Sequence, residues 1–129
     1  MGSNVEIICE LYRAFKEKDY DAFKLICDES ISWHQNPGFP GGGSYIGAEA
    51  VIEHVFKSFD DRWEAWTFKA IEFLDAGDVV IVTGQYEGRY ARTQKKFVSE
   101  AAHFYTVKNK RVVAFQQYCD TKPIWDAMD

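Results

Sequence analysis

The chain has 129 residues, a formal net charge of −5, 47% hydrophobic residues and 16% aromatic residues. This length is typical of one domain that buries its own core, so we expect a single domain over residues 1–129. The negative charge, without a basic cluster, argues against nucleic acid and anionic membranes as partners. No apolar run approaches the roughly 20 residues that cross a bilayer.

The first third of the sequence predicts helices. Ser3 and Glu6 have the spacing of a capping box, and apolar residues then recur at helical intervals. Asp19 is a candidate cap for a second, shorter helix. The segment 31–35 is rich in β-branched and aromatic residues and predicts a strand, which two prolines and three successive glycines end. A third helix is expected from about Ala48.

The remainder of the sequence predicts a meander of strands joined by short turns. The expected strands are 66–74, 79–92, 97–107 and 111–120. Short turns make successive strands antiparallel neighbours. Gly84 and Gly88 lie inside the longest strand, where glycine often marks strong bending or a close approach. We therefore expect an α+β fold: a cone-like, strongly curved antiparallel sheet, packed by three helices from the N-terminal half.

The cysteine pattern bears on the cellular compartment. Cys9, Cys27 and Cys119 are odd in number, widely spaced and set in apolar patterns. This pattern favours reduced core thiols over a disulfide framework. The N-terminus also lacks the basic and apolar stretches of a secretory signal. We expect a cytoplasmic protein.

Three stretches of the sequence resemble a known family. They are "YRAFKEKDYDAFKLICDESISWH", "YIGAEAV" and the ending "EGRYART…FVSEAAHFYTVKNKRVVAFQQYCDT". Together, over roughly residues 5–121, they are similar to the SnoaL-like branch of the NTF2-like superfamily, which includes polyketide cyclases and ketosteroid isomerases. The resemblance implies the cone fold and a homodimer formed through the outer sheet face. It does not choose a function, because this fold hosts isomerases, cyclases, hydrolases, dehydratases and binding domains.

The resemblance also suggests roles for single positions. Asp120 matches the acid/base aspartate of the cyclases, and His34 falls at, or one residue from, the proton-shuttling aspartate of the isomerases. Ala102 takes the place of the isomerases' protonated oxyanion-hole aspartate. Leu11 takes the place of their oxyanion-hole tyrosine, although Tyr12 is adjacent. These differences argue against a steroid isomerase of the usual mechanism.

Asp120 and His34 are the catalytic candidates. A carboxylate at the inner rim of an apolar cone is desolvated, which raises its pKa toward the range useful for acid/base catalysis. The alternative for Asp120 is a strand-end carboxylate that accepts hydrogen bonds from a turn. His34 can shuttle a proton or orient Asp120, or it can simply bond a backbone carbonyl. Trp33 alternates with His34, so only one of the two faces the cone.

The substrate-binding candidates are Tyr12, Trp33, Glu100, Ala102, Phe104 and Gln117. If Ala102 faces inward, as its isomerase counterpart does, then Glu100 and Phe104 share that face; the opposite register makes Glu100 a surface charge. His103 would then face outward, as an interface or structural residue. One of Gln116 and Gln117 is expected to line the cavity, and strand parity does not say which.

The sequence offers no metal or cofactor motif. Its three histidines have no H-x-x-x-H or H-x-H spacing, and there is no P-loop, G-x-G-x-x-G or G-x-S-x-G. We expect a cofactor-independent acid/base enzyme of the isomerase, cyclase, dehydratase or hydrolase type. Its substrate would be a small apolar molecule, cyclic or carbonyl-bearing, covered by a mobile loop at 36–43. The alternatives are a non-catalytic small-molecule-binding domain and a dimeric interaction module.

Overall fold

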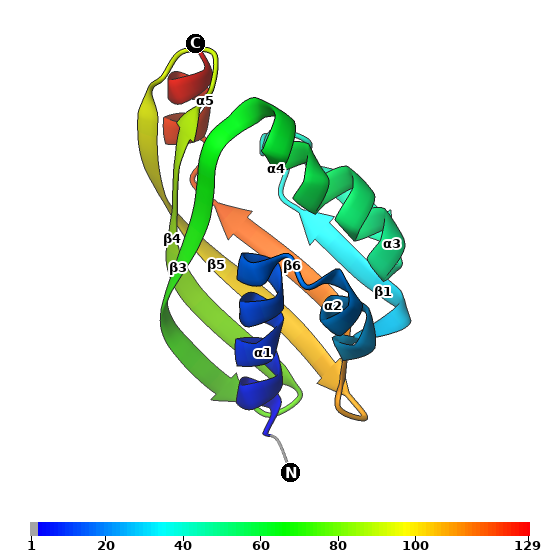
Figure 1. The fold of residues 1–129 in the computed structure, drawn as a ribbon. Helices are drawn as coiled ribbons and strands as arrows, with labels where there is room; N and C mark the ends of the chain where they lie inside the picture. Colours follow the sequence, from blue (N-terminus) through cyan, green and yellow to red (C-terminus); the bar gives the residue numbers. More distant parts are fainter. Residues whose placement is uncertain (1–2) are drawn as a thin grey trace.

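Six strands form one curved sheet in the computed structural model, which describes residues 3–129 (Figure 1). The helices are α1 (Asn4–Glu17), α2 (Tyr20–Ile26), α3 (Ala48–Val51), the π-helical turn η1 (Ile52–Phe56), α4 (Lys57–Arg62) and α5 (Lys122–Met128). The strands are β1 (Cys27–Gln35), β2 (Gly43–Ile46), β3 (Trp63–Ala76), β4 (Val79–Tyr90), β5 (Lys96–Lys108) and β6 (Arg111–Cys119). Helices α1 to α4 cover the same face of the sheet. The expected α+β cone is confirmed.

The helix starts follow the predicted capping residues. Ser3 Oγ accepts from the Glu6 backbone N–H at 3.1 Å, and Glu6 Oε1 accepts from the Ser3 N–H at 3.1 Å, which completes the capping box. Asp19 Oδ1 accepts from the Ala22 N–H at 3.2 Å and caps α2. The third predicted helix begins at Ala48 and runs through α3, η1 and α4 without a break.

The strand order is β2-β1-β6-β5-β4-β3. All neighbours are antiparallel except β1 and β6, which run parallel, so the sheet is mixed and not wholly antiparallel as expected. The cause is the long connection after β1: the chain crosses the concave face as helices, builds β3 to β5, and returns with β6 beside β1. Strand β2, which the sequence did not indicate, pairs with the other edge of β1.

The two glycines of β4 sit where side chains from neighbouring strands cross the backbone. At Gly88, a Cβ would lie 2.6 Å from the carbonyl oxygen of Ala65 and 2.7 Å from the Phe97 ring. At Gly84, a Cβ would overlap the carbonyl oxygen of Lys69 and the Phe68 ring. Glycine is required at both positions because any larger residue would push the β3–β4 pair apart. The predicted close approach is confirmed.

Two segments, helix α5 and the loop between β1 and β2, close one end of the cone. The sequence did not predict that either segment packs there. Helix α5 was not expected, and its Ile124 and Ala127 are buried against the sheet. The loop between β1 and β2 inserts Phe39, whose ring lies 5.7 Å from Trp66 and is 3% exposed. The Trp125 indole N–H of α5 donates to the Gly38 carbonyl and joins the two segments. The loop at 36–43, expected to be mobile, is therefore packed into this end of the cone through Phe39.

The cysteines are free thiols in different environments. Cys27 is buried, Cys119 is half-buried and Cys9 is exposed. The prediction that the cysteines are core thiols is therefore confirmed for Cys27 and wrong for Cys9. Burial raises the pKa of Cys27 to about 12, which keeps it an unreactive thiol. Within residues 3–129, no helix combines the length and apolar character needed to cross a membrane.

Candidate functional site

A chain of hydrogen-bonded side chains crosses the concave face of the sheet. At its centre, His103 Nδ1 of β5 lies 2.6 Å from the Tyr12 hydroxyl of α1, and His103 Nε2 lies 2.7 Å from the Tyr86 hydroxyl of β4. The Gln117 amide of β6 donates to the Tyr86 oxygen at 2.8 Å. The Asn36 backbone N–H donates to Gln117 Oε1 at 3.3 Å. The chain therefore joins α1 to three neighbouring strands.

The direction of these bonds is assigned by counting donors and acceptors. The Asn36 N–H can only donate, so the Gln117 NH₂ group must face Tyr86. The Tyr86 oxygen accepts from Gln117, and Nε2 of His103 is the acceptor within hydrogen-bond distance of the Tyr86 hydroxyl, so we assign the Tyr86 hydrogen to Nε2. A neutral His103 then carries its proton on Nδ1 and donates it to the Tyr12 oxygen. The Tyr12 hydrogen is left for an acceptor beside it, either the neighbouring Tyr105 hydroxyl or a ligand.

Burial keeps the titratable groups of this hydrogen-bonded chain, and the neighbouring Tyr105, uncharged. Desolvation lowers the pKa of His103 from its ordinary 6.5 to about 3. Desolvation also raises the pKa of Tyr12, Tyr86 and Tyr105 above the ordinary tyrosine value. At neutral pH the four groups therefore donate and accept hydrogen bonds without taking up or releasing a proton.

The hydrogen-bonded chain forms part of the wall of an inner cavity of about 40 Å³, large enough for water or the edge of a ligand. The rest of the wall is almost entirely aromatic and aliphatic. Its lining residues are Leu11, Tyr12, Phe15, Trp33, Gln35, Val55, Phe56, Phe59, Trp66, Phe68, Tyr86, His103, Tyr105 and Phe115. Among these residues there is no carboxylate.

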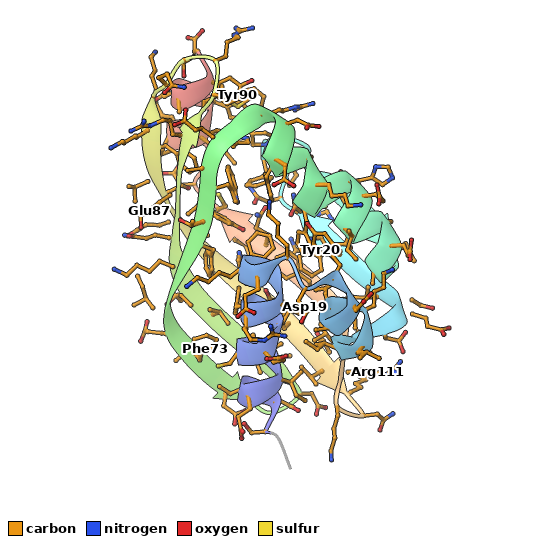
Figure 2. The ribbon with its side chains drawn as sticks, viewed as in Figure 1. Asp19, Tyr20, Phe73, Glu87, Tyr90 and Arg111 are labelled. Atoms are coloured by element: carbon orange, nitrogen blue, oxygen red, sulfur yellow. The ribbon has the colours of Figure 1, made fainter. Side chains whose placement is uncertain are left out.

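The inner cavity adjoins a wider cleft of about 710 Å³, within the range of about 300–1,000 Å³ common for small-molecule sites. The two spaces share Tyr12, Phe15, Phe56, Phe59, Trp66 and Phe68. The cleft lies between the end of α1, α4 and the edge strand β3. Tyr20 lies between α1–α2 and the α3–α4 helix, where its ring stacks on Phe56 at 6.5 Å (Figure 2). The cone is therefore closed at the Phe39 end and open at this end.

The structure does not bring the two catalytic candidates together. Asp120 follows the end of β6, is exposed, and accepts from the Lys122 backbone N–H at 3.3 Å, which is the turn-bonding alternative. His34 Nδ1 lies 2.6 Å from Ser44 Oγ of β2. Neither residue lines the inner cavity. The Asp120–His34 hydrogen bond considered from the sequence does not form, because Asp120 lies in an exposed turn after β6 and the His34 side chain faces away from Trp33 toward Ser44.

The predicted register of β5 is wrong by one residue. The odd-numbered residues face the cone, so His103 is 4% exposed and central to the cavity wall, and not at an interface. Glu100, Ala102 and Phe104 lie on the outer face, and Phe104 is 36% exposed. A slip of one position moves every side chain of a strand to the other face. These three residues therefore cannot contact a ligand inside the cone.

Three binding candidates do lie on the inner side. Tyr12 and Trp33 line the inner cavity, and Trp33 is the member of the Trp33–His34 pair that faces inward. Gln117 is fully buried and supports Tyr86, whereas Gln116 is half-buried on the opposite face. Sequence reasoning missed His103 and Tyr86, although Tyr86 stands between Gly84 and Gly88. Within residues 3–129, no group of three or more His, Cys, Asp or Glu side chains is arranged to hold a metal ion.

Comparisons with known proteins agree with this fold. A model of the SnoaL-like domain matches residues 8–115. An NTF2-like protein from Burkholderia thailandensis E264 is 34% identical, with 100% of this chain and 99% of that chain covered and a TM-score of 0.95. An NTF2-like protein of unknown function from Burkholderia pseudomallei K96243 is 20% identical, with 98% of each chain covered and a TM-score of 0.88. TerC, co-crystallised with polyporic acid, is 20% identical, with 97% of each chain covered and a TM-score of 0.87. No curated protein sequence matches the chain.

Proposed function

The chain belongs to the SnoaL-like domain family, and from that premise we propose that its cone binds a small, planar, largely apolar molecule that carries a carbonyl group. The observation that carries this proposal is the Tyr12–His103 hydrogen bond of 2.6 Å at the point where the aromatic cavity meets the cleft. His103 donates to the Tyr12 oxygen and leaves the Tyr12 hydrogen for an acceptor. A ligand carbonyl is such an acceptor, since it offers lone pairs but no proton.

The surrounding rings favour a planar ligand. Phe68 stacks on Tyr12 with ring centroids 5.4 Å apart, and Phe59 stacks on Trp66 at 4.3 Å. Flat aromatic surfaces of this kind bind ring systems by offset stacking. The inner cavity of about 40 Å³ admits only the carbonyl end, so the ring system lies in the wider cleft. The co-crystallisation of TerC with polyporic acid supports a small-molecule role for this fold.

Removing the Tyr12 hydroxyl is expected to weaken carbonyl binding selectively. With 2-acetylnaphthalene as the probe, Tyr12→Phe should raise the Kd roughly five- to tenfold, since a net hydrogen bond contributes about 1 kcal/mol. Quenching of tryptophan fluorescence measures the binding, because Trp33 and Trp66 line the cavity.

The matched ligand 2-ethylnaphthalene has the same ring system without the carbonyl oxygen. Its Kd should change little in Tyr12→Phe. Tyr45→Phe, which removes a hydroxyl bonded to the Gly41 carbonyl outside the cavity, should bind both ligands as the parent does. Equal losses for the two ligands in Tyr12→Phe would contradict the carbonyl assignment, and no binding of either ligand by the parent would contradict the proposed function.

The same hydrogen bond favours a second candidate function, acid/base catalysis of the isomerase or cyclase type. A tyrosine held by a neutral histidine in a dry site can stabilise negative charge as it develops on a substrate carbonyl oxygen. A general base would then come from the cleft, where Glu17 and Asp60 are the carboxylates. Turnover of a carbonyl substrate that Asp60→Asn abolishes, without loss of its binding, would establish this candidate over simple binding.

We also propose that the outer face of the sheet joins two copies of the chain. Phe104 and Tyr118 form an exposed edge-to-face pair 5.5 Å apart, and Val98 on the same face is 52% exposed. An exposed apolar patch on a sheet face marks an interaction surface, and a two-fold axis through it lets the patch cover its own copy.

A charge placed in this patch is expected to separate the dimer. Phe104→Glu should elute and scatter light as a monomer at concentrations where the parent is a dimer, because each copy would then desolvate a carboxylate against apolar surface. Light scattering after size-exclusion chromatography measures the mass. Leu25→Glu is the control, since Leu25 is 73% exposed on α2, away from the sheet face. A monomeric parent would contradict the proposal.

A further inference from the structure

We propose that the ligand carries a negative charge on the end that faces solvent, and that Lys16 and Lys69 bind it at the mouth of the cleft. The inference rests on the proposed function and adds the chemical class of the ligand: an aromatic acid with its carbonyl end inside and its anionic end outside. Both lysines line the cleft and are exposed. They come from opposite walls of the mouth, α1 and β3.

Each lysine neighbours a residue that lines the inner cavity. Lys16 follows Tyr12 by four residues, so the two lie on the same face of α1 about one turn apart. Lys69 follows Phe68, whose ring stacks on Tyr12. Because β3 is an edge strand, side chains on both of its faces border the cleft. A ring system held at Tyr12 therefore extends outward between the two lysines.

The residues that line the cleft include more cations than anions, whereas the whole protein has a negative net charge. Four cations, Arg13, Lys16, Lys18 and Lys69, line it with only two anions, Glu17 and Asp60, although the chain as a whole has a net charge of −5. Glu10 and Asp19 also lie beside Arg13, so the positive charge that remains at the cleft belongs to Lys16 and Lys69. Exposed cations beside an apolar wall draw in anions.

Two of the four cations form ion pairs with carboxylates of the protein. Arg13 lies 2.7 Å from Glu10, 3.0 Å from Glu17 and 3.1 Å from Asp19. Lys18 lies 2.8 Å from Asp60 and thereby joins the end of α1 to α4 across the mouth. Within residues 3–129, Lys16 and Lys69 are the two cations of the cleft that make no ion pair, so they are available to a ligand anion.

Two naphthalene ligands test the inference. The first is 2-acetylnaphthalene, and the second is 6-acetyl-2-naphthoate, which adds a carboxylate at the opposite end of the same ring system. The parent should bind the acid roughly threefold to tenfold more tightly at low salt, as expected for two exposed ion pairs. The double variant Lys16→Gln/Lys69→Gln should lose that preference and bind the neutral ketone as the parent does. In 1 M NaCl, where the screening length falls to about 3 Å, the preference should disappear.

The control variant Lys96→Gln/Lys108→Gln removes the same charge from two exposed positions at the ends of β5, outside the cleft. It should keep the preference for the acid. If the double variant in the cleft also keeps it, or the parent binds both ligands equally, the anionic end is wrong while the proposed function stands. If the parent binds neither ligand, the proposed function itself fails.

Discussion

Replacing Trp33 by alanine is expected to destabilise the protein by roughly 3–5 kcal/mol, which corresponds to a fall in Tm on the order of 10–20 °C. Trp33 is 3% exposed at the centre of the core. Its ring stacks on Phe115 at 3.8 Å and meets Phe23 and Phe56 edge-on at 5.8 and 5.7 Å. These partners lie on β6, α2 and η1, so the cavity left by the indole cannot collapse without moving three elements.

Trp125→Ala is the matched control for this loss. Trp125 is 49% exposed on α5, and its substitution removes one hydrogen bond to the Gly38 carbonyl, worth about 1 kcal/mol. Urea denaturation of the two variants measures the difference. Adding indole should raise the Tm of Trp33→Ala by more than that of Trp125→Ala, because the apolar cavity left in the core binds a ligand of matching shape. Equal costs for the two variants would show that Trp33 is not the centre of the core.

Most of the order of elements was predictable, because the local signals of α1, α2 and the last four strands agree with the fold. The Ser3–Glu6 capping box and the Asp19 cap form as their spacing indicates. The glycines of β4 mark close approaches, which required only that a strand interior is an unfavourable place for glycine. Helix α5 was missed because its seven residues carry only two buried side chains, Ile124 and Ala127, too few for a helical period to stand out.

The register of β5 was not predictable from the resemblance, and the error had the largest consequence for the site. Both faces of this strand carry apolar residues, so alternation alone does not separate inner from outer. Placing Ala102 at the isomerase aspartate turned His103 outward. The composition of the two faces did hold a signal. The inner set includes Phe97, Tyr105 and Val107, whereas the outer set includes Lys96, Glu100 and Lys108.

The same slip explains why the oxyanion-hole positions looked empty in the sequence. Leu11 and Ala102 were matched to them, but the side chains that meet in the structure are their neighbours, Tyr12 and His103, at 2.6 Å. No sequence pattern predicts this pair, because its two residues are 91 positions apart and lie on α1 and β5. The structure therefore contains a hydrogen-bonded Tyr12–His103 pair that can donate a hydrogen bond to a ligand. It does not contain a hydrogen-bonded pair of Asp120 and His34.

Lowering the pH from 6.5 to 4.5 is expected to cost the folded protein roughly 2–3 kcal/mol through His103 alone. The pKa of His103 is about 3 in the folded protein and 6.5 in an unfolded chain. Between these values the unfolded state binds the proton and the folded state does not, so each pH unit below 6.5 removes about 1.4 kcal/mol of stability. The effect fades above pH 6.5 and is absent from about pH 7.5, where both states hold a neutral imidazole.

His103→Gln removes the titration and keeps a side chain that both donates and accepts. It should be less stable than the parent at pH 7.5, yet its free energy of unfolding should change much less between pH 6.5 and 4.5. The paired carboxylates Glu10 and Asp19, whose pKa values are lowered by Arg13, lose their contribution mainly below this window and do so equally in every variant. If the free energy of unfolding of His103→Gln and of the parent changed equally with pH, His103 would not be held neutral in the fold. The donor and acceptor directions assigned to the hydrogen bonds from Gln117 to Tyr12 would then be wrong.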